Sequence, residues 1–293
     1  MANRRIEEHL EALARLRDGT ASDAAGTLAR ELKDRSNLVV AKAAQVAGEL
    51  AVRDTIPDLL AAFERLFDDS LKRDPQCWGK NAIARALRDM EYGEGAPFLR
   101  GARWVQFEPV WGGQADTAAT LRGICLLALP ACGDVRRETA MRFLVGALAE
   151  PDGTVRADAA RAISAMGGDE AALLLRLKAL TGDEVAAVTG QVFESLLSVE
   201  RAEALEFLRA FLRPEGGEKA EEAALAIGNS RLEAGVDLLI EVYEHARAED
   251  YRAAILRALG IARRESAIEF LRRIAETGRD RDRVEAKATL KLL

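Results

Sequence analysis

Apolar residues recur at helical spacing along most of the chain, and the clearest runs stop at a glycine. These runs are VRADAARAISAMG at 155–167, KAEEAALAIG at 219–228 and YRAAILRALG at 251–260. Spacings of three and four residues between apolar positions are typical of an amphipathic helix. Glycine suits a helix C-terminus because it adopts the left-handed cap conformation at little cost. The pattern therefore predicts a helix that ends at the last glycine of each run.

A second amphipathic segment follows each run, and it begins with an acidic residue: Asp169, Glu233 and Glu265. Acidic groups stabilise the first turn of a helix. The repeating unit is thus helix, tight turn, helix, with a period of about 30–38 residues. Pro57 and Pro97 fall at equivalent places in the N-terminal half, just inside the second helix of a pair, where the missing N–H costs little. No β-strand is expected, because even VVAKAAQVA has helical spacing.

Residues 151–180 carry a family resemblance. Their Pro-Asp turn, the pair Val155 and Arg156, an Ala-rich first helix and a Leu-rich second helix are similar to HEAT repeats, including the HEAT-like repeats of phycobilisome lyases. The resemblance covers roughly residues 36–293, on period and spacing. It implies an all-α fold, a right-handed α-solenoid of helical hairpins, in which the second helices usually line the concave face.

The expected organisation is one solenoid domain over 1–293. Its parts are capping helices at 1–35, HEAT-like repeats at 36–108 and 116–278, an irregular loop at about 106–116, and a C-terminal capping helix at 280–293. Such a fold hosts scaffolds, adaptors and some enzymes, so it does not name a function.

Composition indicates which class of partner and which cellular compartment to expect. The net charge is −6 over 293 residues, which makes nucleic acid an unlikely partner because a general nucleic-acid binder usually shows a basic excess. No apolar run is long enough to cross a membrane, and the charged N-terminus predicts a helix rather than a signal peptide. Three cysteines without a disulfide framework fit a reducing, bacterial-type cytoplasm.

One segment departs from the regular helical pattern of the rest of the chain. All three tryptophans lie between residues 78 and 111, and PVWGGQAD at 109–116 forms a long connection. We call residues 76–122 the Trp-rich segment. It holds one Lys and five Arg against five acidic residues, a net of +1, in a chain of net −6. Because Trp and Arg are enriched at binding hot spots, the segment predicts a recognition site made of Trp104, Trp111, Arg100, Arg103, Gln106, Glu108, Lys80, Asn81, Asp116 and Arg122.

Structural roles are the alternative for the same residues. The aromatic side chains could plug the core of a long inter-repeat connection, and Trp78 could be core at a helix start. Lys80 and Asn81 could instead bind an anion at a helix N-terminus. The arginines could form surface ion pairs, in which case the expected partners are Arg85 with Asp89, Arg103 with Glu108 and Arg122 with Asp116.

The sequence gives little support for catalysis. Glu108 and Asp116 could act as paired carboxylates, but nothing in the sequence places them within reach of each other. The two histidines, His9 and His245, lie at opposite ends of the chain, and the His-Glu pairs of HEAT-repeat metal hydroxylases do not occur. No zinc-ligand spacing surrounds Cys125 and Cys132. We therefore expect no catalytic residue, no metal and no cofactor.

The function that fits these observations is a non-catalytic binding or scaffold module that recognises a protein partner. The alternatives are an enzyme or enzyme accessory on a HEAT-like scaffold, of the chromophore- or cofactor-attaching lyase type or resembling an alkylpurine glycosylase, and a purely structural assembly subunit. The identity of the partner and the oligomeric state stay open.

Overall fold

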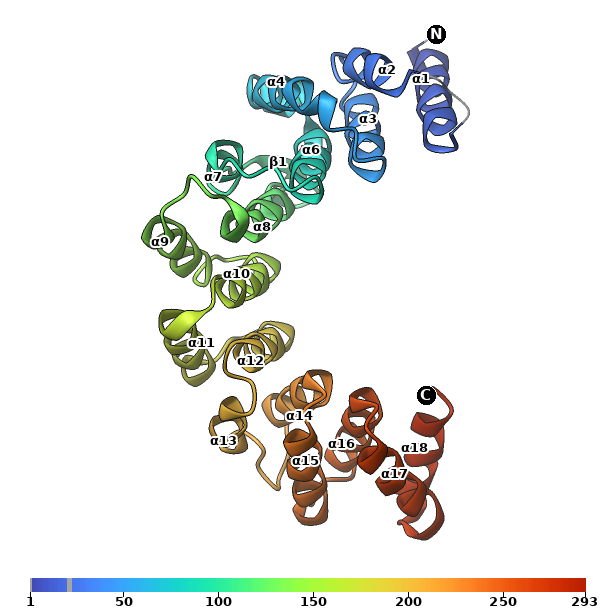
Figure 1. The fold of residues 1–293 in the computed structure, drawn as a ribbon, viewed down its shortest axis with the longest axis vertical. Helices are drawn as coiled ribbons and strands as arrows, with labels where there is room; N and C mark the ends of the chain where they lie inside the picture. The colour runs from blue at the N-terminus through green and yellow to red at the C-terminus, as the bar shows by residue number, and fades with distance from the viewer. Residues whose placement is uncertain (1, 20–22) are drawn as a thin grey trace. The chain divides into compact units, whose positions relative to one another are not determined.

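The computed structural model describes residues 2–19 and 23–293 (Figure 1). Its helices group into two compact units, Met1–Ala147 and Leu148–Leu293. Each unit is built from helical hairpins, so the chain is an all-α solenoid. The single domain over 1–293 stays a prediction.

The first unit is two layers of helices, with a β-hairpin between two of them. Helices α1, α3, α6 and α8 pack side by side in one layer, and α2, α4 and α7 cover them in the other (Figure 1). The elements are α1 (Ala2–Arg17), α2 (Ala24–Glu31), α3 (Asn37–Glu49), α4 (Ile56–Phe67), α5 (Ser70–Arg73), α6 (Trp78–Asp89), α7 (Ala96–Gly101), β1 (Phe107–Val110), β2 (Gly113–Asp116), α8 (Ala119–Ala128) and α9 (Arg137–Ala147).

The second unit repeats the hairpin more regularly. The first helices of its hairpins, α10, α12, α14 and α16, pack in succession, and α18 packs on α16 and α17. The elements are α10 (Gly153–Met166), α11 (Gly168–Thr181), α12 (Ala186–Glu200), α13 (Glu203–Arg209), α14 (Glu218–Ser230), α15 (Glu233–His245), α16 (Glu249–Ala262), α17 (Glu265–Thr277) and α18 (Asp280–Leu290).

Two of the three predicted helix stops are wrong. Gly167 does end α10 with a φ of 63°. Gly228 and Gly260, however, lie inside α14 and α16, and the left-handed cap positions are taken by Arg231 and Arg263. The two glycines serve helix packing instead: a Cβ on Gly228 would lie 2.3 Å from the carbonyl oxygen of Ala258. Glycine is favoured both at helix caps and at close helix contacts, so the sequence pattern alone does not separate the two.

The irregular loop expected at about 106–116 is a short antiparallel hairpin. Phe107 pairs with Asp116 and Val110 with Gly113, which leaves Trp111 and Gly112 as the turn. Gly112, the second residue of the turn, has a φ of 88°, the left-handed conformation that a type II turn requires at this position and that glycine adopts readily. The expectation that the chain has no β-strand is wrong here, while the fold class is all-α as predicted.

All three cysteines are buried with free thiols. Burial raises the pKa of Cys77 and of Cys132 to about 11, and it also raises the pKa of Cys125. Among the described helices, none combines the length and the apolar character needed to cross a membrane.

Candidate functional site

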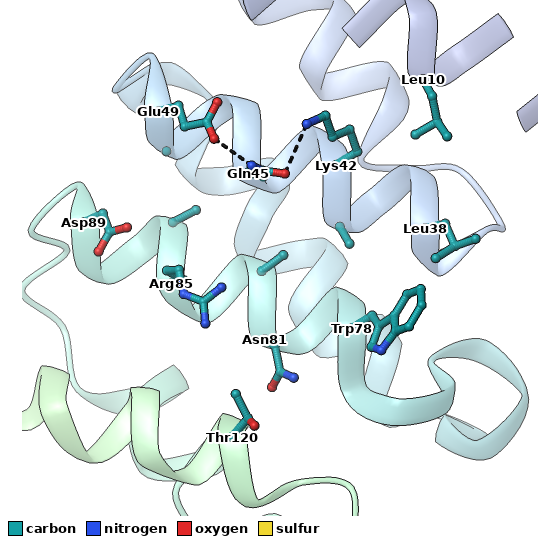
Figure 2. A pocket seen from close by; sticks show the side chains of 14 residues that line it. Leu10, Leu38, Lys42, Gln45, Glu49, Trp78, Asn81, Arg85, Asp89 and Thr120 are labelled. Carbon is teal, nitrogen blue, oxygen red and sulfur yellow. Dashed lines mark hydrogen bonds between the residues drawn. The ribbon is translucent and has the colours of Figure 1, made fainter. Parts of the chain in front are cut away.

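The first unit carries an open groove of about 640 Å³ between α3 and α6. Figure 2 shows the two helices side by side, with residues of α1 and α8 at the margins. The residues that line it are Leu10, Leu38, Ala41, Lys42, Gln45, Gly48, Glu49, Trp78, Asn81, Ala82, Arg85, Ala86, Asp89 and Thr120. Both helices are the first of their hairpins, whereas the resemblance to HEAT repeats predicts that the second helices form the binding face.

Small residues make the groove possible. Ala41 and Gly48 on α3, with Ala82 and Ala86 on α6, have almost no side chain to fill the space between the helices. Gly48 also lets the two backbones approach closely, because a Cβ there would lie 3.1 Å from the Cα of Ala86. The groove is thus a consequence of small residues at helical spacing, a pattern that the sequence contains but that normally indicates tight packing.

One end of the groove is apolar. Leu38 and Trp78 face it from neighbouring helices, and Leu10 adds to it from α1 (Figure 2). The Trp78 side chain is 48% exposed. The alternative in which Trp78 is a core residue at a helix start is therefore wrong, and its indole offers a large open apolar surface.

The centre of the groove is polar. Lys42 Nζ donates to Gln45 Oε1 over 3.2 Å, and Gln45 Nε2 donates to Glu49 Oε1 over 2.6 Å. These dashed contacts in Figure 2 connect successive turns of α3. Across the groove, the Oδ1 atom of Asn81 is buried and has no hydrogen-bond partner in the described part of the chain.

Arg85 supplies a free cation. It does not pair with Asp89, as one sequence expectation has it, because Asp89 accepts from Arg88 Nη2 over 2.8 Å. No described residue forms an ion pair with the exposed Arg85 guanidinium. Asn81 and Arg85 lie one turn apart on α6 and both line the groove (Figure 2).

Lys80 has a structural role, unlike the adjacent Asn81, which lines the groove. Its Nζ is wholly buried, 3.0 Å from Asp74 Oδ2 and 3.2 Å from the carbonyl oxygen of Leu66. The Asp74 carboxylate also accepts from the backbone N–H groups of Gly79 and Lys80, over 2.7 and 3.0 Å. Because a protein carboxylate already occupies the N-terminus of α6, the expectation of an anion site at Lys80 is wrong.

Gln106 joins the hairpin to this buried pair. Its Nε2 donates to the Asp74 carbonyl oxygen over 3.0 Å and to Glu108 Oε1 over 2.7 Å. Its Oε1 accepts from Trp104 Nε1 over 3.1 Å. The Trp104 indole in turn packs edge-on against Phe67, with 4.8 Å between ring centroids. Gln106 and Trp104 therefore fit the structural alternative, in which these side chains fill the core of the connection between two repeats.

The two candidate catalytic carboxylates are held ionised. Burial alone would raise the pKa of Glu108, but hydrogen bonds from Thr117, Gln106 and the Gln76 backbone lower it. Burial would also raise the pKa of Asp116, but hydrogen bonds from the backbone N–H groups of Ala118 and Gln106, together with the Arg122 guanidinium, outweigh burial and lower it. Arg122 Nη1 lies 2.6 Å from Asp116 Oδ2, as the ion-pair alternative predicts. A carboxyl held in its charged form is a poor proton donor.

The remaining members of the predicted site, Trp111, Arg100 and Arg103, do not line the groove. Trp111 is fully exposed at the hairpin turn. Arg100 pairs with Glu64 and lies over the Phe67 ring, 4.2 Å from its centroid. Arg103 lies 4.5 Å over the Phe143 ring rather than pairing with Glu108. Of the ten predicted residues, Asn81 alone lines the groove. Trp78 and Arg85 also line it, although they are not among the predicted site residues.

The described residues contain no cluster of side chains suited to bind a metal ion. Within residues 2–19 and 23–293, no three His, Cys, Asp or Glu side chains cluster closely enough to hold an ion.

No protein-family model matches the chain, and no curated protein sequence matches it. Among solved structures, human deoxyhypusine hydroxylase in complex with glycerol is similar over 96% of this chain and 88% of that chain. The identity is 18% and the TM-score 0.31. That resemblance is too distant to say anything about the activity of this chain.

Proposed function

We propose that the chain is a non-catalytic binding module of the HEAT-like type, and that the groove between α3 and α6 holds a segment of a protein partner. The groove combines an apolar end at Trp78 with a polar centre at Asn81 and Arg85. Mixed apolar and polar lining of this kind is typical of protein recognition, where Trp and Arg most often dominate the binding energy.

The observation that carries the proposal is the Asn81 amide. A buried oxygen without a hydrogen-bond partner costs about 1–3 kcal/mol relative to a satisfied one. A ligand that donates a hydrogen bond in the groove recovers that free energy. Asn81 is therefore better suited to a bound state than to the free chain.

Charge favours a protein over a nucleic acid. Two cations and two carboxylates line the groove: Lys42, Arg85, Glu49 and Asp89. The lining therefore has no excess of positive charge to attract a phosphate backbone. A nucleic-acid site would instead show clustered cations along its length.

Catalysis is disfavoured for a different reason. Glu108, Asp116 and Lys80 are each committed to hydrogen bonds or ion pairs within the fold. These groups stabilise the hairpin and the start of α6. They thereby fix the position of α6, the helix that carries Trp78 and Asn81.

A capture experiment tests the proposal. The full chain is immobilised and exposed to lysate of its native host, beside a Trp78→Ala/Arg85→Ala variant. We expect a protein that the wild type retains and the groove variant loses. Both substitutions remove exposed side chains, so helix content and thermal unfolding should match the wild type.

Matched variants locate the site. Leu173→Ala/Arg272→Ala removes one exposed apolar and one exposed basic side chain from the second unit, and it should retain the partner. Trp111→Ala tests the hairpin turn separately. If the groove variant retains the partner and the Trp111 variant loses it, the hairpin is the binding surface and the groove proposal is wrong. A wild-type chain that binds DNA or a small pigment but no protein would also contradict it.

A further inference from the structure

We infer that the occupant of the groove is an extended peptide that carries an apolar side chain and, about three residues away, an acidic one. The inference rests on the proposed function and specifies the chemistry of its ligand. Three features of the groove lead to it: its length, the Asn81 amide and the uncompensated Arg85.

Length favours a strand-like peptide. On α6 the lining residues run from Trp78 to Asp89, and on α3 from Leu38 to Glu49. Eleven steps of about 1.5 Å give each helix roughly 16 Å of lining. An extended chain that rises about 3.3 Å per residue crosses this length in about five residues. A groove open along two helices accommodates such a chain without enclosing its ends.

The Asn81 side chain selects a backbone amide. A primary amide has an acceptor oxygen beside two N–H donors, which is the complement of a peptide N–H and C=O. Asn81 Oδ1 has no hydrogen-bond partner in the described chain, so an N–H from the ligand has a place to bind. Recognition of the backbone at this point does not depend on the ligand's side chains, and it orients the peptide along α6.

Charges in the groove select an acidic side chain. Asp89 is neutralised by Arg88, with 2.8 Å between Nη2 and Oδ1. On α3 the charges of Lys42 and Glu49 balance each other, and both side chains contact the Gln45 amide between them. Arg85 has no such partner within the described residues. The groove therefore has one uncompensated guanidinium beside Asn81, and a carboxylate pairs with a guanidinium through two parallel hydrogen bonds.

Spacing along α6 sets the spacing in the ligand. Arg85 follows Trp78 by two helical turns, a separation of roughly 10 Å at 1.5 Å per residue. An extended peptide covers that distance in about three residues. The apolar side chain would then contact Trp78 and Leu38, with the carboxylate at Arg85 and a backbone amide at Asn81 between them.

A selection experiment tests this chemistry directly. A phage-displayed library of short random peptides is panned on the full chain, and binding of the selected sequences, made as synthetic peptides, is measured by fluorescence anisotropy. We expect enrichment of an aliphatic or aromatic residue with Asp or Glu two to four positions away, as the spacing estimate predicts. Arg85→Glu should weaken binding of the acidic peptide about tenfold or more, and panning on that variant should enrich Lys or Arg instead.

Control variants separate the contribution of the Arg85 charge from that of the Asn81 amide. Arg272→Glu makes the same charge change on an exposed helix face of the second unit and should leave binding unchanged. Asn81→Ala should weaken every selected peptide without changing the preferred residues. Arg85→Gln provides a neutral replacement if the charge reversal disturbs folding, and it should abolish the acidic preference.

The outcomes distinguish this inference from the proposed function. Peptides enriched without an acidic residue, or an acidic preference that survives Arg85→Glu, would overturn the inference and leave a peptide-binding groove. No enriched peptide, together with a captured protein that depends on the groove, would show that the groove binds a folded surface. No enriched peptide and no captured protein would overturn both.

Discussion

Lys80 and Asp74 form a wholly buried ion pair at the start of α6, with 3.0 Å between Nζ and Oδ2 and neither side chain exposed. The same carboxylate caps the helix, and the Asp74 carbonyl receives the Gln106 amide. One acidic residue thus anchors both the wall of the groove and the base of the hairpin.

Removal of the lysine charge should strongly destabilise the first unit. Lys80→Met leaves the Asp74 carboxylate buried without its cation, which we expect to lower the free energy of unfolding by about 3–5 kcal/mol. Lys72→Met, which removes an exposed lysine 3.2 Å from Asp69, should change it by less than about 1 kcal/mol. Urea denaturation measures both. Equal losses would show that the buried pair has no special role.

The two tryptophans of the hairpin region should behave differently. Trp104→Ala removes an indole packed on Phe67 and hydrogen-bonded to Gln106, which should cost about 2 kcal/mol of stability. Trp111→Ala removes a fully exposed side chain and should change stability by less than about 0.5 kcal/mol. Thermal unfolding of the two single variants checks this, and a destabilised Trp111 variant would contradict the open position of the turn.

Two glycine substitutions should have opposite signs. In Gly228→Ala the new Cβ would meet the Ala258 backbone at 2.3 Å, and because backbone cannot move aside cheaply, we expect a loss of about 1–3 kcal/mol. Gly146, at the end of α9, has open space around it. Gly146→Ala should stabilise the chain by about 0.5 kcal/mol through helix propensity. Calorimetry on both variants measures the two changes, and a Gly228→Ala chain as stable as the wild type would contradict the close packing of α14 on α16.

Acid should selectively remove the stabilisation that Asp183 provides. Burial opposes ionisation of this carboxyl, but hydrogen bonds from Arg156 and Lys178 hold its pKa below the usual range. A depressed folded-state pKa means that the stabilisation is present above the unfolded pKa of about 3.9 and is lost as pH falls through the folded value. Asp183→Asn should therefore be less stable than wild type at pH 7, and the gap should narrow towards pH 3. Asp169→Asn, on the exposed start of α11, is the control and should show a small gap at both values.

Asn81 should show a conflict between stability and binding. Asn81→Leu removes a buried oxygen that has no partner and adds a better helix former, so we expect a gain of about 1 kcal/mol. The same variant should no longer bind the selected peptides. A destabilised Asn81→Leu chain would mean that the amide has a structural role in the free protein.

The helical hairpins could be predicted because their signals are local. Apolar residues at helical spacing mark both helices of residues 151–180, and Pro57 and Pro97 do occupy the first turns of α4 and α7. The hairpin was missed because its strands have four residues each and one contains Pro109, too short for an alternating pattern. The available signal was Gly112, because glycine marks turns that need a positive φ, although the turn is formed by Trp111 and Gly112 rather than by the Gly112-Gly113 pair.

The candidate site was harder to predict because it depends on burial. Lys80 and Asn81 are adjacent in sequence, yet one is buried in an ion pair and the other lines the groove. Which face of α6 packs against Asp74 is decided by tertiary contacts, and a charged residue is by itself taken as exposed. The groove floor was equally hidden, because Ala and Gly at helical spacing predict close packing unless the two helices are seen together.

The buried cysteines have a practical consequence. With all three thiols inside the fold and their pKa values raised, the native protein offers almost no thiolate to alkylating reagents at neutral pH. A single cysteine introduced on the margin of the groove, for example at Thr120, would then be the one readily labelled position. A dye or spin label attached there would report on the groove without any need to remove the native cysteines.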